Sequence, residues 1–167
     1  MKTVKTVVLA LLAVAVVLAL LAAILFVEGS GAGAAGPAYL FSANGREFNI
    51  SLIAANQLEL ETGLMNTTIT NSTMMLFVFP SPGIYPFWME NTYSNLDIMW
   101  LNVSGDSGNV VYLARNTTSC VGKNETWCMD NAYTPNAYAN YVIEAKAGFA
   151  KTNNIGVGTR VGLSEES

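Results

Sequence analysis

The chain has 167 residues, of which 51% are hydrophobic and 12% charged, with a formal net charge of -4 at pH 7. Eleven acidic and six basic residues follow Glu28, so no basic surface is available to neutralise phosphates, which argues against nucleic acid as a partner. The chain contains no histidine, which excludes Ser-His-Asp and Cys-His nucleophile systems and histidine-containing metal clusters. We therefore expect neither a metal nor a cofactor.

An apolar run of twenty-one residues covers positions 7–27, with only Lys2 and Lys5 in front of it and Glu28 behind it. At about 1.5 Å per residue, a helix of this length spans the roughly 30 Å hydrocarbon core of a bilayer. The lysines in front of the run place the N-terminus in the cytoplasm. We therefore expect residues 1–27 to form an uncleaved signal anchor, a single transmembrane helix in contact with membrane lipid.

Two alternatives remain for this segment. Residues 32–34 resemble the cleavage site of a secretory signal, although the apolar region of such signals usually has about 7 to 15 residues. A buried soluble helix would need a larger domain than the remaining chain can build.

Residues 28–37 are rich in glycine and alanine and predict a flexible tether. Residues 38–167 are then a single extracytoplasmic domain.

The outer segment carries six Asn-X-Ser/Thr triplets, where random placement would give about two or three. Asparagine and threonine are abundant in this chain and collect in turns, which is an alternative source of the triplets. Because the triplets lie on the side of the membrane where glycans are transferred, we expect several of them to carry N-linked glycans. They begin at Asn49, Asn66, Asn71, Asn102, Asn116 and Asn124.

The two cysteines, Cys120 and Cys128, both lie in the outer segment. An even number of cysteines in an oxidising compartment favours a disulfide, worth about 2 to 3 kcal/mol for a loop this short. A metal or redox pair is the weaker alternative, because the spacing is not Cys-X-X-Cys and no histidine completes a zinc site.

Beyond the tether, hydrophobic residues alternate with polar ones or form short runs between turn residues, which is the pattern of β-strands. Pro80 and Pro82 are expected to end one of these strands, and residues 104–109 to join two others into a hairpin. The expected strands cover residues 48–52, 75–79, 96–101, 110–113, 141–145 and 160–163.

One short helix interrupts this pattern. Asn56 and Glu59 have the spacing of a capping box and Gly63 supplies a helix stop, so a helix is expected over Gln57–Thr62. Short strands between turns predict a mainly β fold, a compact sandwich or barrel of jelly-roll character with one or two short helices. Five of the six triplets fall in the expected loops, and Asn49 lies on the polar face of its strand, so glycans would clear the core.

Two acidic residues interrupt apolar strand patterns, Asp97 beside Ile98 and Glu144 beside Ile143. A buried carboxylate has a raised pKa, a property of catalytic sites, and carboxylate catalysis needs two acids about 5 to 9.5 Å apart. The structural interpretation is favoured, in which Asp97 bonds a backbone turn and Glu144 pairs with Arg160 across strands. No spacing in the sequence shows that the two acids converge.

Aromatic residues and methionine are dense between positions 85 and 100. Core packing explains most of this density, whereas an exposed aromatic side chain beside polar groups would mark a binding surface. The candidate ligand-binding residues in this segment are Trp88, Glu90, Asn91 and Thr92.

Several short motifs resemble those of a known family in their order and spacing. The motifs are Gly63-Leu64-Met65, residues 75–79, Phe87-Trp88-Met89-Glu90-Asn91-Thr92, Leu96-Asp97-Ile98, the Cys120 and Cys128 pair with Tyr133, residues 141–145, Ala147-Gly148 and residues 155–158. Over residues 48–163 they are similar to the domain of unknown function 192, an uncharacterised region of bacteria and archaea. The resemblance implies a compact, mostly β fold with a short helix ending at Gly-Leu-Met, and it implies no established activity.

The chain departs from the family pattern at several positions. Asn66 stands close to where the family places a basic residue, Glu90 replaces a common lysine, Ser94 and Asn95 lack the usual proline, and Thr159 replaces a common aspartate. If the family binds an anionic ligand through those basic positions, this chain has lost the means. The departures favour a structural or partner-binding role.

We interpret the chain as a single-pass membrane glycoprotein whose extracytoplasmic β domain acts without catalysis, as a binding module or as an accessory subunit among other membrane or envelope proteins. Two alternatives stay open. One is an envelope filament or coat subunit, which packs through the alanine-rich apolar helix. The other is a carboxylate-dependent extracellular hydrolase that uses Asp97 and Glu144 on glycans or peptides.

Overall fold

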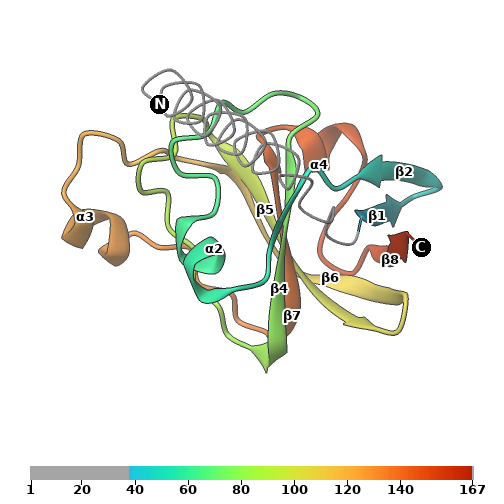
Figure 1. Ribbon diagram of the computed structural model, residues 1–167. Helices are drawn as coiled ribbons and strands as arrows, with labels where there is room; N and C mark the ends of the chain where they lie inside the picture. The colour runs from blue at the N-terminus through green and yellow to red at the C-terminus, as the bar shows by residue number, and fades with distance from the viewer. Residues whose placement is uncertain (1–37, 167) are drawn as a thin grey trace, which may run out of the picture. The chain divides into compact units, whose positions relative to one another are not determined.

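The computed structural model describes residues 38–166, which form eight strands and three short helices (Figure 1). The strands are β1 (Ala38–Ala43), β2 (Arg46–Asn49), β3 (Leu52–Ala54), β4 (Met74–Gly83), β5 (Leu96–Ser104), β6 (Ser107–Thr117), β7 (Ala139–Lys146) and β8 (Arg160–Glu166). The helices are α2 (Gln57–Thr62), α3 (Glu125–Asp130) and α4 (Phe149–Thr152). The expected anchor and tether lie outside the described residues. Within residues 38–166, no helix is long and apolar enough to cross a membrane.

The strands form one sheet in the order β2-β1-β8-β6-β5-β7-β4-β3. All neighbouring strands are antiparallel except β3 and β4, which are parallel. The edge strands β2 and β3 are consecutive in the chain. The two residues between them form hydrogen bonds with β1, near one edge of the sheet, and with β4, near the other edge. Ile50 N–H donates to Tyr39 O at 3.0 Å, and Ser51 N–H donates to Met74 O at 2.9 Å. The sheet is therefore curled into a half-barrel, and the chain crosses from one edge to the other at residues 50 and 51.

The mainly β class is confirmed. Of the two expected forms, a sandwich or a barrel of jelly-roll character, the single curled sheet matches the barrel in part and not the sandwich. Strand β6 explains the difference. It pairs with β5 along its length and with β8 at residues 107–109, so it joins the two groups of strands that a sandwich would separate into two layers.

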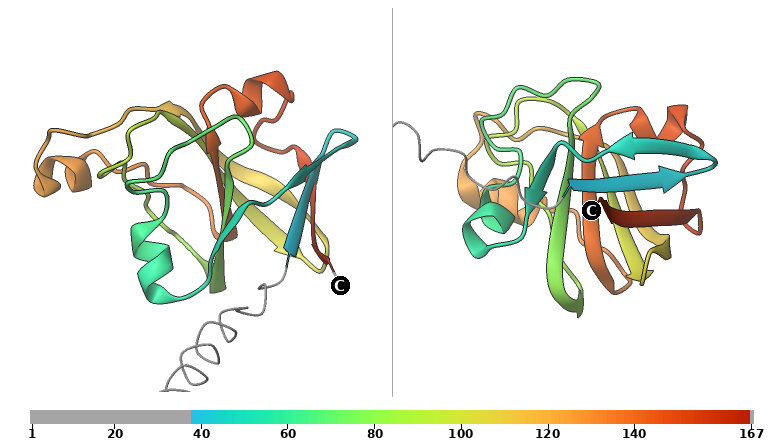
Figure 2. Two further views of the ribbon diagram at one scale, coloured as in Figure 1. Left: turned by 45° about the horizontal axis from the view of Figure 1, so that its top comes forward. Right: turned by 45° about the vertical axis from the view of Figure 1, so that its right-hand side comes forward.

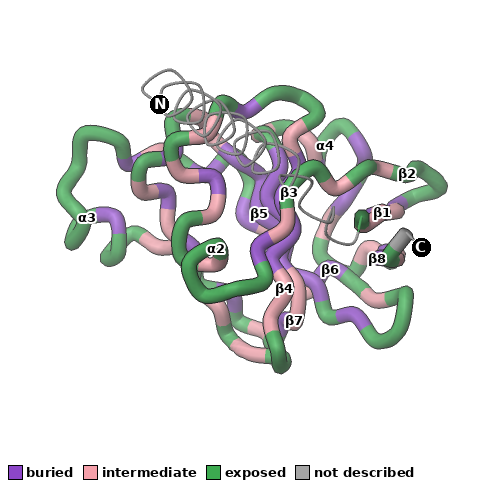
Figure 3. The backbone as a smooth tube through the Cα atoms, viewed as in Figure 1, coloured by how far each residue is buried: buried purple, intermediate pink, exposed green. Residues whose placement is uncertain are grey.

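The central strands are buried on both sides of the sheet, as the burial colours show (Figure 3). Along β5, Ile98 and Trp100 enter one hydrophobic cluster and Met99 and Leu101 enter the other. We call the two sides the Trp100 face and the Met99 face. Side chains of β1, β8 and α4 cover the Met99 face, whereas the segments around α2, before β5 and around α3 cover the Trp100 face. Helices α2 and α3 lie at the end of the molecule away from β1, β2 and β8 (Figures 1 and 2).

Helix α2 forms where the capping signals predicted it. Asn56 Oδ1 accepts from Glu59 N–H at 3.0 Å, and Glu59 Oε2 accepts from Asn56 N–H at 3.2 Å. At the other end, Gly63 N–H donates to Glu59 O at 2.9 Å. No side chain of α2 is buried, so the caps rather than packing define its length.

Other boundaries differ from the prediction. Strand β4 continues through Pro80 and Pro82 to Gly83, because the register with β7 shifts after Val78 and the prolines need not donate to a ladder. The expected strand at residues 48–52 is divided between β2 and β3 by the crossing between the sheet edges. Helices α3 and α4 were not predicted, and they raise the number of short helices above the expected one or two.

The glycosylation triplets are less confined to loops than expected. Asn102 lies in β5 and Asn116 in β6, so the placement of five triplets in loops is wrong for these two. Both strands extend further than their apolar patterns, because the polar ends of β5 and β6 pair with each other in a long hairpin.

Candidate ligand-binding site

Glu144 lies in the middle of β7 on the Trp100 face. Its cross-strand neighbours are Met75 of β4 and Ile98 of β5, and only 4% of its surface is exposed. Within residues 38–166, Glu144 Oε2 is the one buried side-chain oxygen or nitrogen without a hydrogen-bond partner. Burial raises the pKa of Glu144 from 4.5 to about 8, because removal from water disfavours the charged form. At neutral pH the side chain is therefore mainly the uncharged acid.

The expected ion pair between Glu144 and Arg160 is wrong. Strand β7 pairs with β4 and β5, whereas Arg160 begins β8 and lies opposite Asn109 of β6. The sequence places Arg160 on a strand but does not reveal that β5 and β6 separate that strand from β7.

Glu144 forms part of the wall of a pocket of about 240 Å³ between α2 and the loop that precedes β5. This volume suits a ligand smaller than a typical drug molecule. The titratable residues of its wall are Glu61 and Glu144, and the wall contains no lysine or arginine. Apolar side chains form most of the remaining wall: Leu60, Leu64, Met65, Phe77, Pro86 and Phe87.

Gly63 leaves the space in front of the carboxyl open. Its φ of 49° and ψ of -134° suit glycine and strain other residues. A Cβ atom here would lie 3.1 Å from Phe77 Cζ and 3.7 Å from Glu144 Oε2. Any side chain at position 63 would therefore occupy the pocket next to the unpaired oxygen.

The opposite wall is the loop at residues 84–92, and hydrogen bonds fix it. Trp100 Nε1–H donates to Tyr85 O at 2.8 Å. Phe87 and Tyr133 exchange two backbone hydrogen bonds of 3.0 and 2.7 Å. These contacts hold Trp88 at the pocket with its side chain half-buried.

A pair of asparagines connects the two walls. Asn66 N–H donates to Asn91 O at 2.9 Å, and Tyr93 Oη–H donates to Asn66 Oδ1 at 3.1 Å. Asn66 and Asn91 have positive φ values of 56° and 48°, a conformation that asparagine adopts more readily than most residues. The segment after α2 and the loop before β5 are thereby held in a fixed relation.

The four residues expected to bind a ligand separate into two pairs. Trp88 and Thr92 line the pocket, whereas Glu90 and Asn91 do not. Thr92 is buried and its hydroxyl donates to Glu90 O at 3.1 Å, so the turn satisfies the O–H donor internally. Sequence reasoning missed Glu61, which follows Leu60 in the last turn of α2. The predicted helix located Glu61, but only the fold brings it to the Glu144 pocket.

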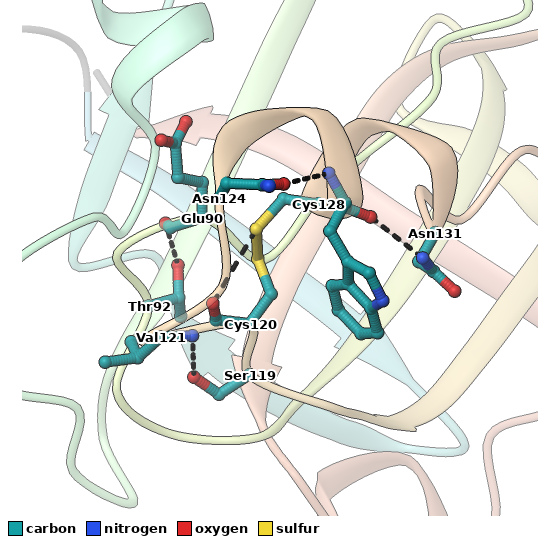
Figure 4. The surroundings of a disulfide bond; sticks show 9 residues. Glu90, Thr92, Ser119, Cys120, Val121, Asn124, Cys128 and Asn131 are labelled. Carbon is teal, nitrogen blue, oxygen red and sulfur yellow. Dashed lines mark hydrogen bonds between the residues drawn. A yellow bond between two sulfur atoms is a disulfide. The ribbon is translucent and has the colours of Figure 1, made fainter.

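The predicted disulfide between Cys120 and Cys128 is present (Figure 4). Both cysteines are buried in the cluster of the Trp100 face. Cys120 N–H donates to Met89 O at 3.4 Å, which ties the disulfide to the residue next to Trp88. Figure 4 also draws the hydrogen bond between Thr92 and Glu90 in the surroundings of the disulfide.

Asp97 lies on the other side of the sheet from Glu144. Ile98 is directly opposite Glu144, and adjacent strand residues point to opposite faces. Three backbone N–H groups donate to the Asp97 carboxylate, from Asn116 at 2.9 Å, Gly148 at 3.0 Å and Ala150 at 2.9 Å. The expected bonding of Asp97 to a backbone turn is therefore observed, and the structure does not bring the two acids together.

The asparagines of the six triplets are all exposed. Within residues 38–166, none of the six donates a hydrogen bond from Nδ2. Five of the ten asparagines outside the triplets do so: Asn44, Asn95, Asn131, Asn140 and Asn153. Nδ2 is the atom to which an N-linked glycan is attached, so the triplet asparagines have this atom available.

Comparisons with known proteins identify the family of the chain and two proteins of similar structure. Residues 40–163 match DUF192, a family described as uncharacterized ACR. A putative transcription regulator from Sinorhizobium meliloti 1021 has a similar structure, with a TM-score of 0.61 and 23% identity over 77% of this chain and 92% of that chain. A protein of unknown function from Novosphingobium aromaticivorans DSM 12444 gives a TM-score of 0.60 and 23% identity over 77% and 93%. At this identity the two structures establish the fold alone. No curated protein sequence matches the chain.

Proposed function

The chain belongs to the DUF192 family, and from this premise we propose that it is a membrane-anchored extracytoplasmic glycoprotein whose β domain binds a small ligand without catalysis. It acts as a binding module or as an accessory subunit of a membrane or cell-envelope complex. The apolar segment at residues 7–27 supports the anchor, and the six exposed asparagines with available Nδ2 atoms support the glycans.

The binding role depends on one observation, the unpaired Oε2 of Glu144 at the pocket. Burying a polar group without a hydrogen bond costs about 1 to 3 kcal/mol, and a hydrophobic residue at this position would avoid that cost. A ligand in the pocket would supply the missing partner. A carboxyl group buried in a pocket with a perturbed pKa is a functional-site signal on physical grounds.

A probe titration tests the binding role. The full chain, purified in mild detergent, is titrated with a small cation, a neutral alcohol and a small carboxylate, while the indole N–H resonances of its three tryptophans are followed. We expect one of the three probe classes to shift the Trp88 resonance, identified by its loss in Trp88→Phe. If none of the three shifts it, the pocket is not a binding site.

Cell fractionation tests the location. We expect the full chain in the membrane fraction, resistant to alkaline extraction, and a glycosidase should lower its mass. A variant with Asn→Gln at all six triplets is the control, and its mass should not change. Recovery of the chain in the cytosol, with free thiols and unmodified asparagines, would contradict the location and the glycans together.

Purification from native membranes distinguishes the assembly states. Different co-purifying chains at fixed stoichiometry support the accessory subunit. Polymers of this chain alone support the alternative of an envelope filament or coat subunit.

The hydrolase alternative survives in a modified form, because Glu61 and Glu144 line the same pocket. A protonated Glu144 could act as a general acid, with Glu61 as the second carboxyl group of the site. Glu61 is exposed and its Oε1 accepts from Gln57 Nε2 at 2.9 Å. Hydrolysis of a glycan or peptide that both Glu61→Gln and Glu144→Gln abolish would favour the enzyme over the binding module.

A further inference from the structure

The charges around the pocket select the class of ligand. Glu61 and Glu144 are the titratable residues of the wall, and no lysine or arginine faces them from it. An anionic ligand would meet two carboxyl groups without a compensating positive charge. A cation would meet two groups able to carry negative charge, one of which is buried and unpaired.

The remaining wall selects the kind of cation. A primary ammonium group needs three hydrogen-bond acceptors, but most side chains of the wall are apolar. An alkylated ammonium group has few or no N–H groups to satisfy and contacts apolar and aromatic side chains through its methyl groups. Aromatic rings near an acid are the usual site for such cations.

Trp88 is the aromatic side chain available for this contact. Phe77 and Phe87 pack against each other edge to face, with ring centroids 4.7 Å apart. The Trp88 ring forms no such pair with another aromatic side chain of residues 38–166, and it is half-buried at the pocket. Indole is the most favourable aromatic partner for a cation.

We propose that the pocket binds an alkylated ammonium group, with its positive charge at the Glu144 carboxylate and its methyl groups against Trp88 and the apolar wall. This inference rests on the proposed binding function and names the ligand class of that site.

The proposal predicts that binding is coupled to proton release. Burial raises the pKa of Glu144 to about 8, and the neighbours that face it from β4 and β5, Met75 and Ile98, carry no charge. A bound cation stabilises the ionised carboxylate, so the acid must lose its proton on binding near neutral pH. Affinity should therefore rise about tenfold per pH unit below pH 8 and level off above it.

The test is a titration of the full chain in mild detergent with tetramethylammonium chloride between pH 6 and pH 9, with sodium chloride at equal concentration as the salt control. We expect a shift of the Trp88 indole resonance and an apparent affinity about tenfold higher at pH 7 than at pH 6. Glu144→Gln should abolish binding and the pH dependence. Because the wild-type side chain is already uncharged at neutral pH, this variant should fold. Glu125→Gln changes an exposed acid of α3 and should bind like the wild type.

The other probes separate the ways in which the proposal can fail. If tert-butanol shifts the Trp88 resonance and binds more weakly above pH 8, the protonated acid serves as a donor, and the ligand class is wrong while the binding function stands. Binding of acetate at Trp88 has the same consequence. If tetramethylammonium binds equally well to Glu144→Gln, the inference is wrong. If no probe shifts Trp88, both the inference and the binding function fail.

Discussion

Asp97 and Glu144 are buried acids on the adjacent strands β5 and β7, yet their surroundings are opposite. Asp97 is 1% exposed and accepts three backbone hydrogen bonds on the Met99 face. Glu144 is 4% exposed on the Trp100 face, and its Oε2 accepts none. The backbone supplies the partners of Asp97, whereas α2 and the loop before β5 leave a pocket at Glu144.

This difference shows how a structural acid and a candidate binding acid are recognised in one fold. The three N–H groups around Asp97 connect β5 to β6 and to the start of α4, so the carboxylate stabilises the fold itself. Glu144 connects nothing, and its burial costs stability unless a ligand compensates. The acid on the Met99 face therefore stabilises the fold, whereas the acid on the Trp100 face is a candidate for ligand binding.

The largest expected effect comes from Asp97. Replacing it by alanine leaves three backbone N–H groups without their charged acceptor, which should destabilise the domain by about 5 kcal/mol. Denaturant unfolding measures this loss. Asp106→Ala, in the exposed turn of the β5–β6 hairpin, is the control and should change the free energy of unfolding by less than about 0.5 kcal/mol. Similar losses in the free energy of unfolding for the two variants would contradict the structural role of Asp97.

Glu144 should affect the pH dependence of stability instead. The unfolded chain loses this proton near pH 4.5, whereas the folded chain holds it to about pH 8. The folded state therefore binds more protons between these values, and the free energy of unfolding should fall by up to about 1.4 kcal/mol per pH unit as pH rises.

Unfolding curves between pH 5 and pH 9 measure this slope. Glu144→Gln should remove the contribution and be more stable than the wild type at pH 8. If the free energies of unfolding of the wild type and the variant fall in parallel as pH rises, Glu144 ionises normally in the folded state.

The disulfide extends the comparison to the loops of the Trp100 face. The double variant Cys120→Ser and Cys128→Ser should lose about 2 to 3 kcal/mol. Hydrogen exchange should increase in residues 84–92 and around α3, while α4 and β8 on the Met99 face keep their protection. Equal loss of protection on both faces would argue against the assignment of the disulfide to the pocket side.

The smallest expected effect concerns α2. Asn56→Ala removes the capping box and should cost about 1 kcal/mol, with faster exchange in α2. Because α2 buries no side chain, Gln57→Ala should cost less than Asn56→Ala. If the two variants lose equal stability, the cap does not define the pocket wall.

The sequence was sufficient for the features that depend on local chemistry. The capping box at Asn56 and Glu59 identified α2, the turn residues between β5 and β6 identified their hairpin, and the two cysteines identified the disulfide. Each of these signals acts over at most a few residues or has only one possible partner.

Features that depend on strand order could not be predicted from the sequence. The expected pair of Glu144 and Arg160 failed because β5 and β6 lie between their strands. The alternative in which Asp97 and Glu144 form a catalytic pair is wrong, because strand register sets them on opposite faces. Glu61 reaches the pocket only because the fold places α2 opposite the loop before β5.

The most direct test is a carboxyl titration of Glu144 by nuclear magnetic resonance. The full chain is labelled with ¹³C at its glutamate carboxyls, and Glu144→Gln assigns the signal. We expect Glu144 to titrate near pH 8 without ligand, and its pKa to fall in the presence of tetramethylammonium. Titration at the ordinary value of 4.5, unchanged by the cation, would contradict the account of Glu144 as a buried acid awaiting a ligand.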